Sequence, residues 1–269
     1  MDYKKVSIFL KEKVPNFVPK AGIVLGSGLG KIAELIDIKM SINYNEIPGF
    51  KKSTVEGHAG NLIFGYLQNI PIIAMQGRNH FYEGHTMQEI TFPIKVLKYL
   101  GINYLITSNA VGAMNPEYEI GDIVIIKDHI NLMGTNPLIG PNDDQLGTRF
   151  PDMSQVYDIQ MRKLAKEYAQ QNDIRIHEGI YVALSGPTFE TPAEYKFLRI
   201  IGGDIVGMST VPEVLTATHM NLPVYSMSIV TDLGVEGRIV KITHEDVQAA
   251  ANAAADKMSD IVKHIIINR

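Results

Sequence analysis

Polar residues that could do chemistry gather in four short segments of the chain. These segments are residues 26–30, 75–85, 185–194 and 207–213. Together they supply glycines, an arginine, histidines, hydroxyl groups and glutamates, which suit an anion such as phosphate and a flat polar ring. Because the chain has no cysteine, thiolate chemistry and Cys-ligated metal sites are excluded.

The first segment, residues 26–30, reads Gly-Ser-Gly-Leu-Gly and directly follows an apolar run. Glycines let a backbone turn tightly and expose its N–H groups beside a helix N-terminus, which can cradle an anion. The segment is neither a dinucleotide fingerprint nor a P-loop, because Lys31 and Leu25 stand where those patterns require glycine. A plain turn between a strand and a helix explains it equally well.

The second segment, residues 75–85, ends an apolar run and carries Arg78, His80 and His85. The guanidinium group of Arg78 offers a fork for phosphate oxygens, and a nearby histidine can donate a second hydrogen bond to the same group. A network of structural ion pairs is the first alternative. A metal site at the two histidines is a weaker one, since no helical pair or carboxylate at ligand spacing supports it.

The third segment predicts a helix start, because Thr191 and Glu194 form a capping box with Pro192 at the first helical position. Glu190 then lies just outside the helix N-terminus, where the helix dipole favours an ionised carboxylate. Phe189 could stack on a flat ring. The alternative is that Glu190 only complements the dipole and Phe189 belongs to the core.

The fourth segment predicts another capping box, formed by Thr210 and Glu213 after a short strand. Ser209 would then hold an anion with its hydroxyl group and its backbone N–H, although a simple helix cap explains it as well. Anion donors recur at three strand-to-helix junctions, and an arginine accompanies them. Capping of the helices alone does not require so many donors. Their recurrence favours an anion site.

The elements that must position these segments alternate along the chain. Apolar runs predict strands at 21–25, 62–67, 71–76, 103–108, 120–126, 179–185, 204–207 and 223–230, and helical spacing covers 29–36, 87–100, 161–168 and 247–265. This alternation predicts an α/β fold with a largely parallel central sheet. Residues 131–151 lack either period, and so long a loop is expected at a functional site or a subunit interface.

Composition bounds the class of protein. With 269 residues, 45% of them hydrophobic and 20% charged, the chain matches an ordinary globular protein with one large core. A net charge of −4 makes nucleic acid a poor partner. No stretch resembles a signal peptide or a membrane span, so we expect a cytoplasmic protein without a membrane partner.

Seven segments resemble the signature segments of trimeric, low-molecular-mass purine nucleoside phosphorylases. In the order and spacing of that family, they are residues 26–30, 53–60, 75–84, 109–112, 128–132, 186–191 and 207–213. The resemblance implies a single domain over residues 1–269, built as an α/β sandwich with a largely parallel or mixed sheet flanked by helices. It also implies a homotrimer, small-molecule substrates as partners, no cofactor and no metal.

The reaction implied by the resemblance is phosphorolysis, in which a purine ribonucleoside or 2′-deoxyribonucleoside and phosphate yield the free base and the pentose 1-phosphate. By this resemblance, phosphate is held by Ser27, His58, Arg78, His80, the backbone N–H of Ala110, and Ser209. The nucleoside is held by Tyr82, Phe189, Glu190, Met208, Asp232, His244 and, from a neighbouring subunit, Phe150. The catalytic residues among them are His80, Glu190, Asp232 and His244.

Asp232 departs from the family pattern, because members specific for 6-oxopurines carry asparagine at this position. An amide donates and accepts hydrogen bonds, whereas an ionised aspartate only accepts, which suits a 6-amino group. Glu190 and His244 instead favour inosine and guanosine. A protonated Asp232, with its pKa raised by burial, would reconcile these signals. An aspartate that faces the surface is the remaining alternative.

The leading hypothesis is therefore a phosphorylase for inosine and guanosine. A phosphorylase that accepts adenosine or methylthioadenosine is the alternative, favoured by Asp232. A non-catalytic protein that binds nucleosides or nucleotides is the third hypothesis, and the complete set of phosphate donors argues against it.

Overall fold

The computed structural model describes residues 2–26, 29–52 and 59–269. Ser27 and His58, both expected at the phosphate site, lie outside these ranges. The strands are β1 (Ala21–Leu25), β2 (Asp37–Asn43), β3 (Asn61–Leu67), β4 (Ile70–Gln76), β5 (Tyr104–Ala113), β6 (Ile123–Asn131), β7 (Ile176–Ala183), β8 (Ile205–Gly207) and β9 (Val224–Leu233). The helices are α1 (Tyr3–Lys13), α2 (Ile32–Leu35), α3 (Met87–Leu100), α4 (Ile159–Gln171), α5 (Pro192–Ile200), α6 (Val211–His219), α7 (His244–Ala253) and α8 (Ala255–Asn268), with short 3₁₀ turns at Tyr44–Glu46 and Phe81–Glu83.

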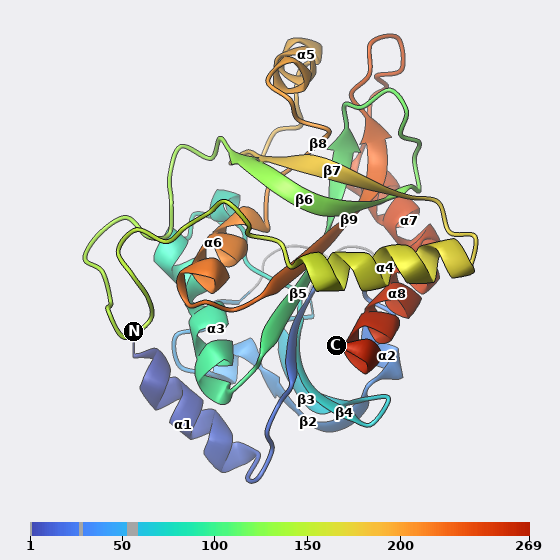
Figure 1. Ribbon diagram of the computed structural model, residues 1–269. Helices are drawn as coiled ribbons and strands as arrows, with labels where there is room; N and C mark the ends of the chain where they lie inside the picture. Colours follow the sequence, from blue (N-terminus) through green and yellow to red (C-terminus); the bar gives the residue numbers. More distant parts are fainter. Residues whose placement is uncertain (1, 27–28, 53–58) are drawn as a thin grey trace.

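Within the described ranges the strands form one mixed sheet in the order β2-β3-β4-β1-β5-β8-β7-β6-β9. The pairs β1–β4, β1–β5, β5–β9, β6–β7 and β7–β8 are parallel, and the other pairs are antiparallel. Because β5 also pairs with β9, the strands β5, β8, β7, β6 and β9 close into a ring (Figure 1). The C-terminal ends of β5 and β9 therefore lie side by side, and β8 pairs with the same end of β5.

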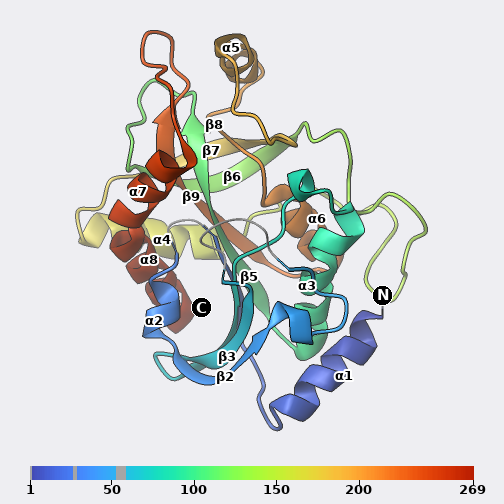
Figure 2. The ribbon, with the colours of Figure 1, turned by 180° about the vertical axis from the view of Figure 1, so that it is seen from behind.

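Helices cover both faces of the sheet. Helices α1, α3 and α6 lie on one side, and α2, α4, α7 and α8 lie on the other (Figure 1, Figure 2). Neighbouring strand residues face opposite ways, so that Val24 and Ile73 belong to one hydrophobic cluster whereas Ile23 and Ile72 belong to another. Burial on both faces explains the unbroken apolar runs of these strands. The predicted α/β sandwich with a mixed central sheet and flanking helices is confirmed.

The differences from the predicted elements have simple causes. Strand β2 pairs only with β3 at the edge of the sheet and is largely exposed, so it has no apolar run to detect. The helical spacing over 247–265 predicts one helix, but the structure has two, α7 and α8, which meet at Ala254. No helix in the described part of the chain is long and apolar enough to cross a membrane.

Candidate functional site

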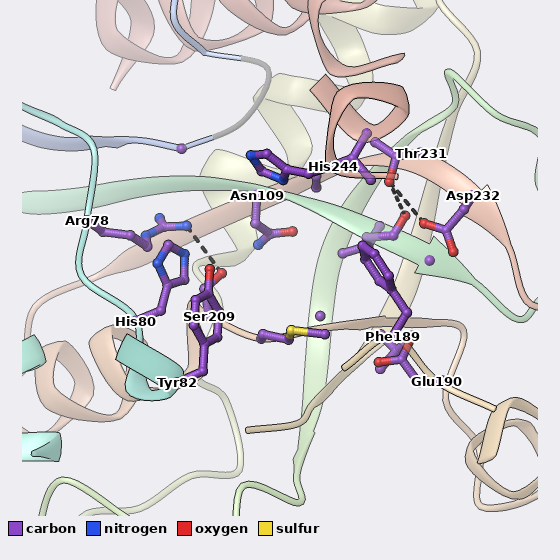
Figure 3. Close-up of a pocket in the computed structure, with 18 residues that line it drawn as sticks. Arg78, His80, Tyr82, Asn109, Phe189, Glu190, Ser209, Thr231, Asp232 and His244 are labelled. Carbon is purple, nitrogen blue, oxygen red and sulfur yellow. Dashed lines mark hydrogen bonds between the residues drawn. The ribbon is translucent and has the colours of Figure 1, made fainter. Parts of the chain in front are cut away.

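A cavity lies where the ends of β5, β8 and β9 meet the loop after β4 and the first turn of α7 (Figure 3). Its lining residues are Gly26, Arg78, His80, Tyr82, Asn109, Ala110, Val111, Gly112, Phe189, Glu190, Val206, Gly207, Met208, Ser209, Thr231, Asp232, His244 and Val247. Every site residue predicted from the sequence that lies in the described part of the chain lines this cavity, with the exception of Phe150.

One end of the cavity is built around Arg78, which is only 3% exposed. One guanidinium nitrogen donates to the backbone oxygen of Ser108 at 2.7 Å and to the hydroxyl oxygen of Ser209 at 3.3 Å, and Nε lies 2.8 Å from a carboxylate oxygen of Glu213. These partners hold the guanidinium group at the junction of β4, β5 and α6. Because Glu213 neutralises the charge of Arg78, an anion here must be stabilised mainly by hydrogen-bond donors.

The capping box predicted for Thr210 and Glu213 is wrong. Thr210 caps nothing with its side chain and has φ 68° and ψ −54°, while the N–H of Val211 donates to the carbonyl of Ser209 at 2.7 Å. These features define a γ-turn, a strained conformation for a residue with a side chain. The turn leaves the side chain of Glu213 to pair with Arg78.

Ser209 therefore offers less to an anion than the sequence suggests. Its backbone N–H, which was expected to face the anion, donates instead to the hydroxyl group of Tyr181 at 3.2 Å. Its own hydroxyl group faces the cavity beside Arg78 (Figure 3). The threonine of the γ-turn, Thr210, also accepts a hydrogen bond from the side-chain amide of Asn109 at 2.7 Å, which ties the turn to β5.

His80 stands beside Arg78 and is oriented by its neighbours. Its Nδ1 lies 3.1 Å from a carboxylate oxygen of Glu83, and that same oxygen accepts from the backbone N–H of His80 at 2.6 Å. The ring of Tyr82 stacks on the imidazole with 4.8 Å between centroids. A carboxylate partner at Nδ1 places a proton there and fixes the tautomer.

Gly26 closes the same end and needs to be glycine. A Cβ atom there would come 2.2 Å from the backbone oxygen of Ser108 and 2.9 Å from a guanidinium nitrogen of Arg78. The backbone after β1 therefore approaches Arg78 more closely than any side chain allows. Across the described residues, no group of three or more histidine, aspartate or glutamate side chains could hold a metal ion.

The other end of the cavity presents two carboxyl groups, from Glu190 and Asp232. Asp232 is 6% exposed, so the alternative of an aspartate facing the surface is wrong. Its oxygens accept from the hydroxyl groups of Tyr195 at 2.9 Å and Thr231 at 3.1 Å (Figure 3 shows the second bond). Burial raises the pKa of Asp232, in the direction expected from the sequence.

Glu190 lies where the sequence predicts it, but burial acts on its carboxyl group. The capping box of Thr191 and Glu194 is confirmed, with Pro192 at the helix start, so Glu190 does precede the N-terminus of α5. Burial raises the pKa of Glu190, because removal from water outweighs the hydrogen bonds with its own backbone and with Tyr195 that lower it. Its Oε1 atom is buried and has no hydrogen-bond partner within the described ranges.

The remaining predicted residues divide into two groups. Phe189 lines the cavity and is 45% exposed, so the alternative that it belongs to the core is wrong. His244, the first residue of α7, and Met208 also line the cavity. Phe150 lies outside this cavity and is 85% exposed, within the long loop that the sequence left without regular structure.

A family model described as the phosphorylase superfamily matches residues 20–267. The chain belongs to this phosphorylase superfamily. It is 47% identical over 260 residues to a purine nucleoside phosphorylase 1 of Geobacillus stearothermophilus. The aligned region covers 97% of this chain and 94% of that protein.

Solved structures agree with the assignment to the phosphorylase superfamily. A purine nucleoside phosphorylase of Schistosoma in complex with hypoxanthine matches with a TM-score of 0.93 and 42% identity, over 99% of this chain and 96% of that one. A Schistosoma mansoni purine nucleoside phosphorylase in complex with adenosine matches with a TM-score of 0.93, 43% identity and the same coverage. The purine nucleoside phosphorylase family predicted by the sequence motifs is confirmed, and its trimeric assembly stays a prediction.

In this phosphorylase superfamily member, three residues around the cavity escaped the sequence analysis. Glu213 was assigned to a helix cap, Asn109 was noted only within a motif, and Tyr195 was not singled out at all. Each acts through a contact with a residue far away in the chain, which no local pattern reveals. The Thr-x-x-Glu pattern at Thr210 even predicts a helix cap that the structure does not have.

Proposed function

We propose that this protein is a purine nucleoside phosphorylase that cleaves purine ribonucleosides and 2′-deoxyribonucleosides with phosphate, releasing the base and the pentose 1-phosphate. Inosine and guanosine are the leading substrates. The observation that carries the proposal is that one cavity has anion donors at one end and hydrogen-bonding carboxyl groups at the other. The family assignment and the near-complete match to purine nucleoside phosphorylases support it.

The phosphate end supplies the nucleophile. Arg78, His80 and Ser209, together with the expected Ser27, His58 and the backbone N–H of Ala110, hold phosphate beneath the anomeric carbon of the sugar. Cleavage of an N-glycosidic bond builds positive charge on the sugar, so a phosphate dianion placed there both attacks and stabilises. Phosphate is a co-substrate, and the reaction needs no cofactor.

The other groups receive the nucleoside. Tyr82, Met208 and His244 contact the ribose, and Phe189 stacks on the purine. Glu190 and Asp232 bind the edge of the base, where stabilisation of the departing purine by hydrogen bonding or proton transfer lowers the barrier.

We also propose that the active unit is a homotrimer. The largely exposed ring of Phe150 lies outside its own chain's cavity, and a closed ring with head-to-tail contacts would bring it to a neighbour's ribose pocket. Sedimentation should then show three copies per particle. A monomer with full activity at assay concentration would refute this assembly.

The test of the activity is a panel of inosine, guanosine, xanthosine and adenosine, incubated with and without phosphate. Phosphate-dependent release of free base and pentose 1-phosphate is expected. A protein that binds these nucleosides without releasing base under either condition would be a binding module, and the proposal would be wrong.

A further inference from the structure

The hydroxyl group of Tyr195 occupies an unusual place, between the two carboxyl groups at the base end of the cavity. Tyr195 belongs to α5 and is 4% exposed. Its hydroxyl group donates to Oδ2 of Asp232 at 2.9 Å and also interacts with the carboxyl group of Glu190. One hydroxyl group thus links two acidic side chains that come from different elements.

Two glycines make room for this arrangement. A Cβ atom on Gly234, which directly follows β9, would come 2.1 Å from the ring of Tyr195. A Cβ atom on Gly112 in β5 would come 2.8 Å from Oδ2 of Asp232 and 3.2 Å from the Tyr195 hydroxyl oxygen. The ring and its hydrogen bond are therefore fixed by close backbone approach on two sides.

The carboxyl groups of Glu190 and Asp232 do not carry charge independently. Burial raises the pKa of both groups, and the charge of Asp232 raises the pKa of Glu190 further. Because both carboxyl groups are buried and interact with one hydroxyl group, ionisation of one opposes ionisation of the other, and a proton held by the pair can lie on either group.

The hydrogen bonds favour one position for this proton. Asp232 accepts from the hydroxyl group of Tyr195 at 2.9 Å, and a donor of this kind stabilises the ionised form. The Thr231 hydroxyl group adds less, because its single proton is shared between Asp232 at 3.1 Å and the backbone oxygen of Val111 at 3.2 Å. Glu190 also interacts with Tyr195, but its buried Oε1 atom has no hydrogen-bond partner among the described residues, so a proton is better placed there. The cavity then presents a donor at Glu190 and an acceptor at Asp232.

This pattern complements a 6-aminopurine, in which N1 accepts and the amino group donates, and the opposite proton position complements a 6-oxopurine. We propose that Tyr195 is a specificity-determining positioning residue, which holds Asp232 as an acceptor and opens the site to adenosine as well as to 6-oxopurine nucleosides. This inference rests on the proposed phosphorylase function. It assigns acceptance of the 6-amino group to a residue outside the family's signature segments.

The test compares kcat/KM for adenosine and inosine at saturating phosphate, with adenine and hypoxanthine quantified directly by chromatography. Wild type should cleave both. Tyr195→Phe should lower the adenosine-to-inosine ratio by about tenfold, the loss expected for one hydrogen bond to a charged group. Tyr118→Phe is the matched control, because this buried tyrosine outside the cavity also loses one hydrogen bond, to the backbone oxygen of Glu178, and its ratio should not change.

The Asp232→Asn background separates a role through Asp232 from a structural one. In that background Tyr195→Phe should leave the ratio unchanged, because no carboxylate remains to be held. If Tyr195→Phe does not fold, Gly234→Ala, which displaces the same ring, should produce the same fall in the ratio.

Three results have different meanings. Cleavage of inosine without any cleavage of adenosine would overturn the inference and leave the phosphorylase function standing. Equal losses for both nucleosides in Tyr195→Phe would also overturn it, since a structural role lowers both together. Cleavage of neither nucleoside by wild type would instead overturn the proposed function.

Discussion

The two ends of the cavity use charge in opposite ways. At the phosphate end, Arg78 and Glu213 form a buried pair of opposite charges 2.8 Å apart. At the base end, Glu190 and Asp232 are two acidic groups that both interact with Tyr195. A pair of opposite charges favours one arrangement, whereas two buried acidic groups with coupled ionisation can hold a proton on either group and so can take two arrangements. The first end fits a single invariant ligand, and the second fits a ligand that varies.

The two ends of the cavity therefore have different tasks, because one positions phosphate and the other distinguishes between purine bases. The phosphate end has to hold the same anion in every catalytic cycle, so rigidity is useful there. The base end has to recognise an edge whose donors and acceptors differ between purines. Substitutions at the two ends should therefore have separable effects, which the following experiments examine.

The largest effect is expected from Asp232→Ala. Loss of this carboxyl group removes the partner that stabilises the departing purine, so kcat should fall by ~10²–10⁴-fold for every nucleoside that wild type accepts. The phosphate KM should change little. Steady-state kinetics with inosine and with phosphate varied in turn measure both quantities. An unchanged kcat would remove Asp232 from the base site.

Arg78→Ala should act mainly on phosphate. It removes the guanidinium fork and leaves Glu213 as a buried unpaired charge, so kcat/KM for phosphate should fall by ~10²-fold and unfolding should become easier by about 3–5 kcal/mol. Arg78→Lys is the control, because it restores a positive charge without the fork. A loss confined to the nucleoside KM would contradict the division of the cavity into two ends.

Glu213→Gln should have a smaller effect at the same end. The amide keeps the shape of the side chain but no longer holds Arg78 by charge, so kcat/KM for phosphate should fall by about tenfold. The adenosine-to-inosine ratio should not move. A changed ratio would mean that the two ends are coupled.

The smallest effect is the pH dependence of stability in Glu190→Gln. Burial raises the pKa of Glu190 above its ordinary value of 4.5, so the stability linked to its protonated form is present below that value and is lost as pH rises through the raised pKa. Glutamine does not titrate. The Tm of the variant, compared with that of wild type, should therefore increase as the pH rises above 4.5 and through the raised pKa. A constant difference would show that Glu190 is not desolvated.

Local pattern was enough for most of the sheet. Strands buried on both faces, such as β1 and β4, must be apolar throughout, and this constraint is visible in the sequence itself. Strand β2 was missed because an exposed edge strand needs no apolar run. The division between α7 and α8 was missed because the helical spacing of apolar residues continues across the break.

By itself, the sequence determined the α/β class, the family and many of the residues that face the cavity, because motifs at strand ends are local and strand ends converge in such a fold. Asn109 and Thr231 line the cavity without having been predicted to, and Phe150 lies outside it. Only the tertiary structure decided what these residues do to one another. Glu213 turned from a helix cap into the partner of Arg78, and Tyr195 was placed between two carboxyl groups. Charge balance and proton position depend on distances between groups that are remote in the chain, and folding alone sets those distances.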